Sequence, residues 1–379
     1  MARLKPRPFK DKTLQKYIRF RDFDWVLMAF VLAICAVGVV EIYSATLHTK
    51  FVGAHVRQVY WVVTGLLVMF VMSRINYQVL LENTPWMYIA SLVSLVAVLA
   101  IGQTYLGARR WIRIGGSTHF QPSEWVKLVL ILAMAKYFSD PNKFREEMSF
   151  TDLLKAGSVV FVPMLLVLKQ PDMGTALTYL PIAIMGLFLG GMKFRHAAII
   201  FCAAALIAVP AYKFGLKQYQ KDRIQTFINP DVDPQKKGYQ SIQSQIAVGS
   251  GGLWGKGTTK GSQTQGLFLP VTHTDFIFAA FSEEHGFVGA VGILLLYFMV
   301  LMRLIHNAQT APDRAGAFVV MGVVAVLAFH VLVNVGMVVG FMPVVGIPLP
   351  LMSYGGSSVL FMFIALGIVM NVRMRRFVN

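Results

Sequence analysis

The chain has 379 residues, of which 56% are hydrophobic and 14% charged, and its formal net charge at pH 7 is +17. A soluble globular domain carries about 25% charged residues, so this composition excludes an ordinary water-facing fold. The hydrophobicity also excludes a disordered chain. The composition therefore predicts an integral membrane protein, and the meaning of the positive charge depends on where the lysines and arginines lie.

Long apolar segments follow one another along most of the chain. A membrane-spanning helix needs about 20 mainly apolar residues. Candidate spans lie at 25–43, 57–73, 85–102, 123–138, 154–169, 173–192, 196–215, 275–303, 314–341 and 355–372. The sequence thus predicts an all-α integral membrane protein with about ten transmembrane helices, in one polytopic domain over residues 1–379. The eighth candidate is long enough to be tilted or broken.

The basic residues predict the orientation of these spans, because lysine and arginine concentrate in short cytoplasmic loops. If both termini are cytoplasmic, twenty basic residues fall in inner segments and six in the short outer loops. We therefore expect a basic cytoplasmic tail at 1–24 and a second cytoplasmic tail at 373–379. The positive charge then indicates orientation and contact with anionic membrane lipids, and not binding to nucleic acid.

One hydrophilic stretch, residues 216–274, is much longer than the other loops and is predicted to lie at the outer face between helices seven and eight. It contains a turn cluster at Asn229–Pro234, a helix-like segment at Ser241–Ala247 and a glycine-rich segment at Gly249–Gly257. Loops of this length are commonly functional.

Several ionisable residues lie within or beside the predicted spans, where they are costly and commonly functional. Glu124 and Lys127 share a helix face at i,i+3, so they can form a structural pair or serve chemistry. Asp172 precedes the sixth span, where it can cap the helix or take part in a site. His330 and Asn334 share a face of the ninth span, where hydrogen bonding between helices is the expected role.

The segment from Leu269 to Phe278 is the most informative one. Asp275 opens the very apolar eighth span, so we expect its carboxylate at or just above the outer interface, with access to water. Glu283 follows on nearly the same face, about 12 Å deeper. Basic residues near the outer face are Arg109, Arg110, Arg113, Lys127, Lys256 and Lys260. A carboxylate beside basic groups suits a base acting next to an anionic headgroup or diphosphate. The residues favour a lipid-headgroup enzyme or a transporter, and they do not decide between the two.

Motifs for other kinds of chemistry are missing from the sequence. The Gly-Lys pair at 255–256 lacks the first glycine and the following Ser or Thr of a phosphate-binding P-loop. There is no His-Glu-x-x-His pattern, no Cys/His cluster and no Gly-x-Ser-x-Gly turn. Redox, NTP-driven and zinc chemistry are therefore not expected.

Eight short motifs complete the sequence pattern. They are Phe120–Glu124, Gln170–Thr175, Gly249–Gly257, His273–Phe278, Asn334–Gly340, Met342-Pro343, Gly346–Leu351 and Ser353–Ser358. Together they resemble the motifs of the SEDS family (shape, elongation, division and sporulation) of bacterial peptidoglycan polymerases, over about residues 24 to 372. Gly255–Gly257, Thr264-Gln265 and Pro343–Pro348 are more similar to the rod-elongation branch of this family than to its division branch.

The resemblance implies a ten-span protein of the bacterial cytoplasmic (inner) membrane that polymerises lipid II into glycan strands at the outer face during cell elongation. It implies that Asp275 is the essential catalytic acid. The other residues that it assigns to the substrate site or cavity are Glu124, Lys127, Asp172, Arg110, Lys256, His273 and Thr274. Many relatives carry Glu shortly before the His-Thr-Asp triplet, where this chain has Val271-Thr272, so any role of that Glu is absent here or taken by another acid.

The resemblance also implies partners and cofactors. The expected partners are lipid II, the growing glycan chain, a class B penicillin-binding protein that acts as transpeptidase, and membrane proteins of the elongation complex. No covalent cofactor is expected, and a divalent cation (Mg or Mn) could assist. Two other functions stay open, namely a flippase for the lipid-linked precursor and a non-catalytic scaffold of the synthesis complex.

Overall fold

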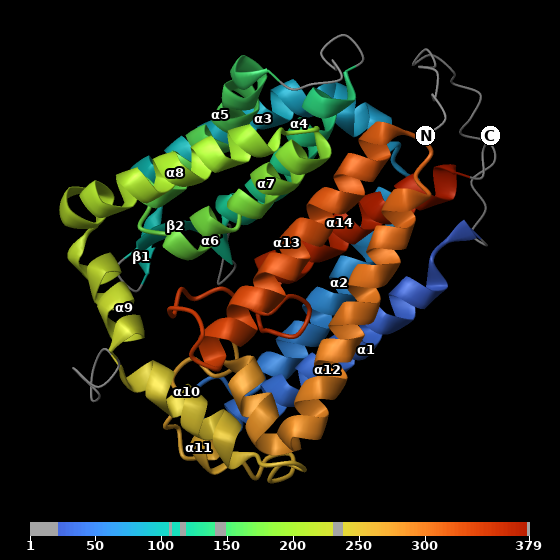
Figure 1. Cartoon of the computed structure of the whole chain (residues 1–379). Helices are drawn as coiled ribbons and strands as arrows, with labels where there is room; N and C mark the ends of the chain where they lie inside the picture. The colour runs from blue at the N-terminus through green and yellow to red at the C-terminus, as the bar shows by residue number, and fades with distance from the viewer. Residues whose placement is uncertain (1–21, 106–107, 114–118, 141–148, 230–237, 377–379) are drawn as a thin grey trace.

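The computed structural model describes residues 22–105, 108–113, 119–140, 149–229 and 238–376, and helices dominate this part of the chain (Figure 1). The first helices are α1 (Trp25–Thr46), α2 (Ala54–Arg74), α3 (Tyr77–Ile101), α4 (Pro122–Ser139), α5 (Phe150–Lys169), α6 (Met173–Leu177), α7 (Leu180–Leu189) and α8 (Phe194–Pro210), which continues into a π-helical turn at Ala211–Gly215. The later helices are α9 (Gln218–Ile228), α10 (Tyr239–Ser250), α11 (Ser262–Gln265), α12 (Ile277–Gln309), α13 (Arg314–Val338) and α14 (Gly356–Arg375).

Each predicted span coincides with helical structure. Among the described residues, seven helices are long and apolar enough to cross a membrane, namely α1, α2, α3, α5, α12, α13 and α14. The predicted fourth span is α4, which carries Glu124 and Lys127 and is largely buried against its neighbours. The predicted sixth span is divided into α6 and α7, and the seventh is the short apolar helix α8. The protein is therefore a helical, multi-pass membrane protein, as predicted.

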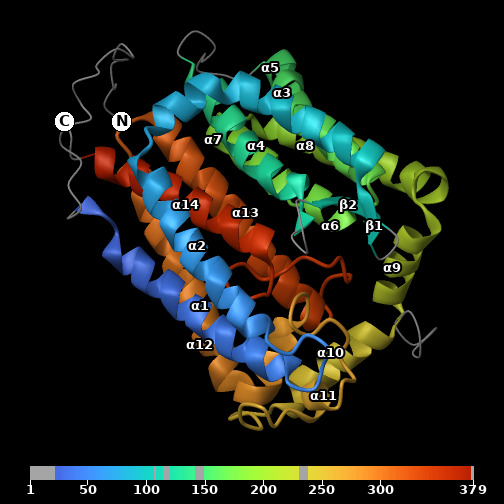
Figure 2. The same cartoon turned by 180° about the vertical axis from the view of Figure 1, so that it is seen from behind.

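The helices pack around α13, which contacts α4, α7, α12 and α14 (Figures 1 and 2). On one side, α1, α2, α12 and α14 lie next to one another, and on the other side α3, α4, α5 and α7 do so. Large apolar side chains are exposed on the outer surfaces, including Trp86 (73% exposed), Phe188 (71%) and Phe201 (74%). An apolar outer surface around a well-packed interior is what a bilayer requires of helices whose backbone groups are satisfied internally.

A cluster of charges ties several helix ends together. Asp24 caps the start of α1, since its carboxylate accepts a hydrogen bond from the N–H of Leu27 at 3.2 Å. The same carboxylate binds Arg303 near the end of α12 at 2.9 Å and Arg373 near the end of α14 at 3.1 Å. The beginning of α1 and the end of α14 thus lie at the same end of the bundle, which agrees with an even number of crossings.

The predicted long loop 216–274 lies toward the opposite end and is partly helical. It contains α9, α10 and α11, and the helix-like segment Ser241–Ala247 falls within α10 as predicted. Helix α10 packs against α12 and α13 (Figure 1). The turn cluster Asn229–Pro234 and the tail 1–24 lie mostly outside the described residues, and α14 continues to Arg375, into the predicted tail 373–379.

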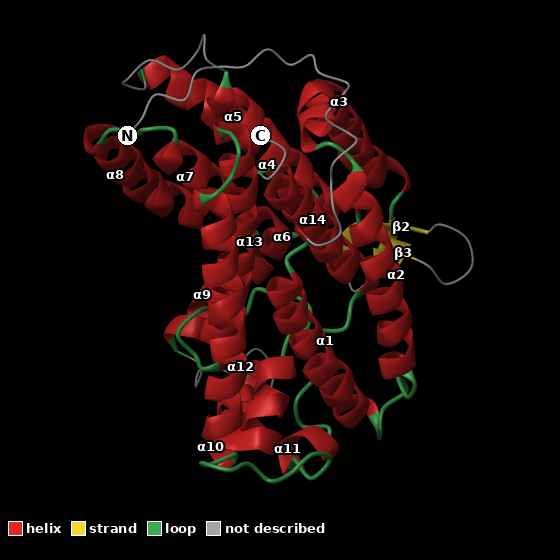
Figure 3. Ribbon diagram, turned by 90° about the vertical axis from the view of Figure 1, so that its right-hand side faces the viewer, coloured by secondary structure: helices red, strands yellow, loops and turns green. Residues whose placement is uncertain are grey.

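Two features differ from the prediction. Three short antiparallel strands follow α3, so the protein is not strictly all-α (Figure 3). They are β1 (Gln103–Tyr105), β2 (Ala108–Arg113) and β3 (His119–Phe120). Strands this short give too little alternation for a sequence pattern to reveal. The second difference is that the eighth span begins at Ile277, two residues after Asp275. Its break at Gly286 is one of the two forms that the sequence allowed for this long span.

Candidate active site

The turn before α12 carries Asp275, and its backbone is held by the C-terminal part of the chain. Three successive carbonyls, those of His273–Asp275, each accept a hydrogen bond. Tyr354 donates to the first from its backbone N–H at 3.0 Å, and the Ser353 hydroxyl donates to the second at 2.6 Å. The side-chain amide of Asn334 donates to the third at 2.9 Å. These bonds hold the turn through its backbone, and none of them uses the Asp275 carboxylate.

Asp275 is a half-buried residue, and the charges of Arg223, Arg110 and Asp172 act on its carboxylate. Burial raises the pKa of Asp275 to about 6, while the positive charges of Arg223 and Arg110 oppose this rise. The backbone of Gly346 passes beside the carboxylate with φ +73°, and a Cβ there would stand 3.2 Å from Oδ2. A carboxyl group with this pKa is ionised at neutral pH, and it is a better proton acceptor than an ordinary aspartate.

The segment that supports this turn is itself fixed by α13. The His330 ring lies with Nδ1 3.1 Å from the carbonyl of Pro348, and the Asn334 amide donates to the carbonyl of Ile347 at 2.8 Å. The Ser353 hydroxyl also accepts a hydrogen bond from the N–H of Leu349 at 2.8 Å. His330 and Asn334 therefore have the structural role expected from their i,i+4 spacing. Both contact a loop, and His330 also lies beside Lys127 of α4.

Asp172 has the capping role that its sequence position allowed, while its part in a substrate site stays a prediction. It caps α6, since its carboxylate accepts hydrogen bonds from the N–H of Thr175 at 3.2 Å and from the Thr175 hydroxyl at 2.9 Å. It also accepts from the side chain of Gln121 at 2.9 Å, and Arg110 Nη1 lies 3.6 Å away. Arg110 is one third exposed while Asp172 is buried, and the charges of both act on Asp275.

Glu124 and Lys127 form the predicted ion pair. Lys127 Nζ lies 2.7 Å from Glu124 Oε2, and the Lys127 side chain is fully buried. The ammonium also lies 3.4 Å from Nε2 of His330 and 4.4 Å from the centre of the Phe361 ring. This pair therefore joins α4 to α13 and α14, one layer beneath the segment that supports Asp275.

His273 and Thr274 flank the carboxylate in different ways. The His273 ring is buried between Phe51 and Tyr354, with ring centres 4.7 Å and 5.8 Å away. Burial lowers the pKa of His273 to about 4, so the ring is neutral at pH 7. The one hydrogen of the Thr274 hydroxyl can go to the Val271 carbonyl, 3.2 Å away, or to the Asp275 carboxylate, and the second of these bonds lowers the pKa of Asp275.

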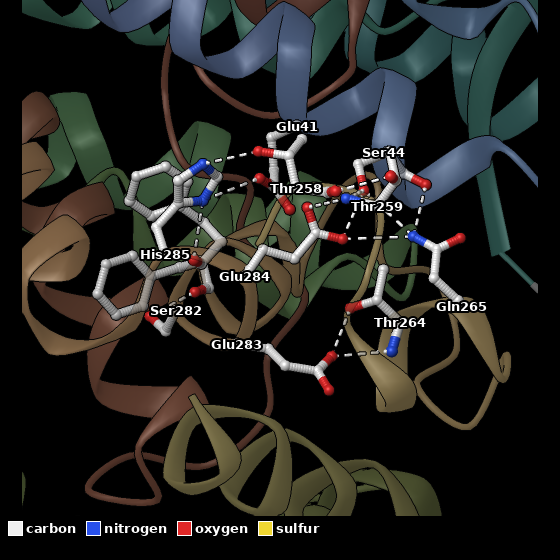
Figure 4. Close-up of polar contacts among 12 residues, drawn as sticks. Glu41, Ser44, Thr258, Thr259, Thr264, Gln265, Ser282, Glu283, Glu284 and His285 are labelled. Atoms are coloured by element: carbon white, nitrogen blue, oxygen red, sulfur yellow. Dashed lines mark hydrogen bonds and ion pairs between the residues drawn. The ribbon is translucent and has the colours of Figure 1, made fainter. Parts of the chain in front are cut away.

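Lys256 belongs to a second cluster. Its ammonium lies 2.8 Å from Glu283 Oε1, 2.7 Å from the Ser250 hydroxyl and 2.8 Å from the Ser262 hydroxyl. Glu283 is fully buried and also accepts hydrogen bonds from Gln263 and Thr264 (Figure 4). The role of Lys256 in substrate binding stays a prediction, and the structure adds that its charge is already engaged by Glu283.

Two residues were missed by the sequence analysis. Arg223 acts on Asp275 more strongly than Arg110 does, and it comes from α9, where it is one of several basic residues in a long polar segment without a motif. Glu41 is a fully buried acid in the C-terminal part of the apolar helix α1. The rule that ionisable residues in spans default to function could have found Glu41.

Of the other predicted basic residues, Lys260 is exposed.

The donor set around Asp275 suits an anionic, diphosphate-containing ligand better than a resident metal. Among the described residues, no group of three or more His, Cys, Asp or Glu side chains is placed to hold a metal ion. The carboxylate of Asp172 is already occupied by Gln121 and Thr175. Arginines whose charges act on a carboxylate base fit proton transfer beside a negatively charged leaving group.

Fold and site together define a multi-pass membrane protein with a carboxylate–arginine site near one end of the helix bundle. A family model described as "Cell cycle protein", which covers FtsW, RodA and SpoVE, matches residues 24–377. The peptidoglycan glycosyltransferase MrdB of Escherichia coli K12 is 37% identical to this chain, over 93% of this chain and 94% of MrdB. The chain belongs to the FtsW/RodA/SpoVE family, as the sequence motifs indicated.

Solved structures agree with this assignment. A chain of a peptidoglycan synthase complex, described as coordinating polymerization and crosslinking, superposes with a TM-score of 0.81 at 34% identity, and the match covers 94% of this chain and 98% of that chain. The rod shape determining protein RodA of Thermus thermophilus superposes with a TM-score of 0.70 at 31% identity and the same coverage.

Proposed function

We propose that this chain is a peptidoglycan glycosyltransferase that polymerises lipid II into glycan strands during cell elongation. Its relatives named for this activity or for rod shape support the proposal, since they match almost the whole chain. The observation that carries it is the state of Asp275, a half-buried residue whose backbone is fixed and whose carboxylate is acted on by Arg110 and Arg223, with a pKa of about 6.

In this reaction Asp275 accepts the proton of the acceptor sugar's 4-hydroxyl. The freed oxygen forms a bond to the anomeric carbon of the donor, and the bond from that carbon to the diphosphate oxygen breaks. Arg110 and Arg223 stabilise the negative charge of the departing lipid diphosphate. The rigid turn contributes by placing the base, because orientation lowers the barrier more than basicity does for a carboxylate. The apolar outer surfaces of the helices accept the polyprenyl chains.

The divalent cation considered from the sequence stays outside this proposal. The described side chains do not form a metal site of their own, so a cation would have to arrive with the substrate diphosphate, as magnesium often does. No step above depends on it. Polymerisation measured with and without a chelator tests whether one is needed.

The proposal includes an orientation and a partner. We infer that both termini are cytoplasmic and that Asp275 faces the outer side, because the basic residues of the short loops concentrate at the end of the bundle that carries Asp24 and Arg373. A class B penicillin-binding protein is the proposed partner, supported by the similarity to a synthase complex that couples polymerization to crosslinking.

The test is polymerisation of lipid II by the purified protein, with and without the transpeptidase. We expect glycan strands from the wild type, and a loss of at least about 100-fold for Asp275→Asn, which keeps the shape and removes the base. Asp152→Asn, at the start of α5, is the matched control with wild-type activity. Wild-type polymerisation by Asp275→Asn would overturn the assignment. Transport of lipid II without polymerisation would indicate a flippase, and neither activity would indicate a scaffold.

A further inference from the structure

Helix α12 is broken near its outer end. Gly286 has φ 67° and ψ −167°, so the helical hydrogen bonds are interrupted between the first part of α12, which follows directly after Asp275, and the long second part. Non-helical backbone at this depth is tolerated only where protein groups satisfy it. Such a break is a place where two parts of a helix can move relative to one another.

The glycine-rich segment of the long loop fills this break. The N–H groups of Lys256 and Gly257 donate to the carbonyls of Glu283 and Glu284 at 3.1 Å and 2.9 Å. In return, the N–H groups of Phe287 and Val288 donate to the carbonyls of residues 252 and 253 at 2.8 Å and 3.1 Å. The segment thus replaces the missing turn of the helix. Gly255 and Gly286 touch backbone to backbone, which leaves no room for a side chain at either position.

Three buried carboxylates surround this joint, and they differ in how they are satisfied (Figure 4). Glu283 accepts hydrogen bonds on both oxygens, from Lys256 among others. Glu284 accepts hydrogen bonds from the Ser44 hydroxyl, the N–H of residue 259 and the side chain of residue 265. Glu41, on the facing side of α1, is fully buried, and neither of its oxygens has a hydrogen-bond partner among the described residues.

The group that faces Glu41 with compatible chemistry is His285, the last residue before the break. His285 Nδ1 lies 3.8 Å from Glu41 Oε2 and 3.3 Å from the Phe281 carbonyl, so two acceptors face this nitrogen. The other charged groups that act on Glu41 are the carboxylates of Glu283 and Glu284, which repel a negative charge there, and Lys256 is already bound to Glu283. An ionised Glu41 therefore depends on a proton on His285.

We propose that Glu41 and His285 share one proton, and that this proton closes the joint in α12 onto the segment Gly252–Gly257. The proton resides on Glu41 or on His285, and the pair is neutral overall in both arrangements. When it is lost to solvent, Glu41 carries a negative charge without a cation beside it, next to the carboxylates of Glu283 and Glu284. Helix α1 and the first part of α12 then repel each other.

The surroundings of His285 allow both arrangements. Two acceptors face Nδ1, so this nitrogen carries a hydrogen. Nε2 lies 3.4 Å from the Thr258 hydroxyl, which can donate to a neutral ring or accept from a protonated one. The ring is about one third exposed, which gives the proton a path to water. Thr258 belongs to the same loop as the segment that fills the break. Gain or loss of the proton therefore changes a contact of that loop.

The consequence for catalysis follows from connectivity. The first part of α12, Ile277–His285, is continuous with the Asp275 turn, so opening of the joint displaces the base. Glu41 and His285 are positioning residues in this sense. The effect on catalysis rests on the proposed function, whereas the opening of the joint in α12 does not.

The decisive measurement is therefore amide hydrogen exchange of the full-length protein in detergent, read as protection factors for residues 252–257 and 286–288 between pH 6 and pH 9.5. In the wild type we expect protection to fall about tenfold per pH unit above the point where the pair loses its proton. Glu41→Gln should remove this pH dependence, because no charge can appear. His285→Gln should move the fall to lower pH, because Glu41 must then hold the proton alone.

Glu82→Gln, an exposed acid on α3, is the matched control and should respond like the wild type. The two variants act in opposite directions, so His285→Gln alone still tests the proposal if Glu41→Gln does not fold. A flat wild-type profile, or a Glu41→Gln profile with the wild-type pH dependence, would overturn it. In lipid II polymerisation, the alkaline loss of rate should disappear in Glu41→Gln. If no variant polymerises lipid II, the exchange result still stands, so the two proposals fail separately.

Discussion

Asp275 and Glu283 lie eight residues apart on the same stretch of chain, and they are held in opposite ways. Asp275 is fixed through its backbone carbonyl, while its carboxylate does not hold the turn and is acted on by the charges of Arg223 and Arg110. Glu283 is fixed through its carboxylate, which accepts hydrogen bonds from the loop on both oxygens and is fully buried. The comparison teaches that the occupancy of the carboxylate oxygens, and not burial or sequence position alone, separates an acid available for chemistry from an acid that holds the fold.

Glu124 belongs to the second kind, and removal of its partner should have the largest effect on stability. Lys127→Met leaves the buried Glu124 carboxylate without its ion-pair partner, so we expect a loss of about 3–5 kcal/mol in the free energy of unfolding. Thermal unfolding in detergent measures it. The double variant Glu124→Gln/Lys127→Met should recover part of the loss. Lys136→Met on the same helix, whose ammonium is exposed, should change little. An equal loss of stability in Lys127→Met and Lys136→Met would contradict the structural role of the Glu124–Lys127 pair.

The pH dependence of polymerisation sharpens the description of Asp275. The group acts as a base only when ionised, and its pKa is raised to about 6. The wild-type rate should therefore fall about tenfold for each pH unit below 6 and level off above it, until the alkaline loss expected from the Glu41–His285 pair begins. An acid limb near pH 4, where an ordinary aspartate titrates, would show that the carboxylate is not desolvated in the working enzyme.

Ser353 tests the backbone side of the comparison. Ser353→Ala removes the hydrogen bond to the Thr274 carbonyl and the acceptor for Leu349, which should cost about 1 kcal/mol and lower kcat/KM about fivefold. The matched control is Ser94→Ala on α3, whose hydroxyl bonds within its own helix. Steady-state kinetics with lipid II measure the effect. An unchanged rate in Ser353→Ala would mean that the turn is rigid without this bond.

Substitution of Arg223 should give the smallest change, a small shift in the pH dependence of polymerisation. Its charge opposes the rise in the pKa of Asp275, so Arg223→Gln should move the acid limb of the rate profile upward, by less than about one pH unit. Arg223→Lys keeps the charge and should leave the limb in place. A downward shift in Arg223→Gln would contradict the electrostatic assignment.

What could be predicted from the sequence was local. The i,i+3 pair Glu124–Lys127, the i,i+4 pair His330–Asn334 and the cap formed by Asp172 depend on spacing within a few residues, and each forms the expected contacts. The apolar spans could be predicted because a bilayer demands long hydrophobic helices.

What could not be predicted depends on contacts between distant parts of the chain. Ser44 and Glu284 are 240 positions apart, and Asn334 and Asp275 are 59 apart. The action of Arg223 on Asp275 depends on where α9 folds back, which no periodicity reveals. The break at Gly286 depends on backbone groups donated by the long loop, so the sequence allowed a tilted or a broken helix without deciding between them.

One experiment tests the central claim most directly, namely Asp275→Asn and Glu283→Gln compared in the same preparation for unfolding temperature and for glycan formed per folded molecule. We predict that Asp275→Asn unfolds like the wild type and loses at least about 100-fold in polymerisation. Glu283→Gln should unfold at a lower temperature, because its free energy of unfolding falls by about 1–3 kcal/mol. Its folded fraction should retain most of the polymerisation activity. Wild-type polymerisation by Asp275→Asn, or loss of activity in stable, fully folded Glu283→Gln, would contradict the account.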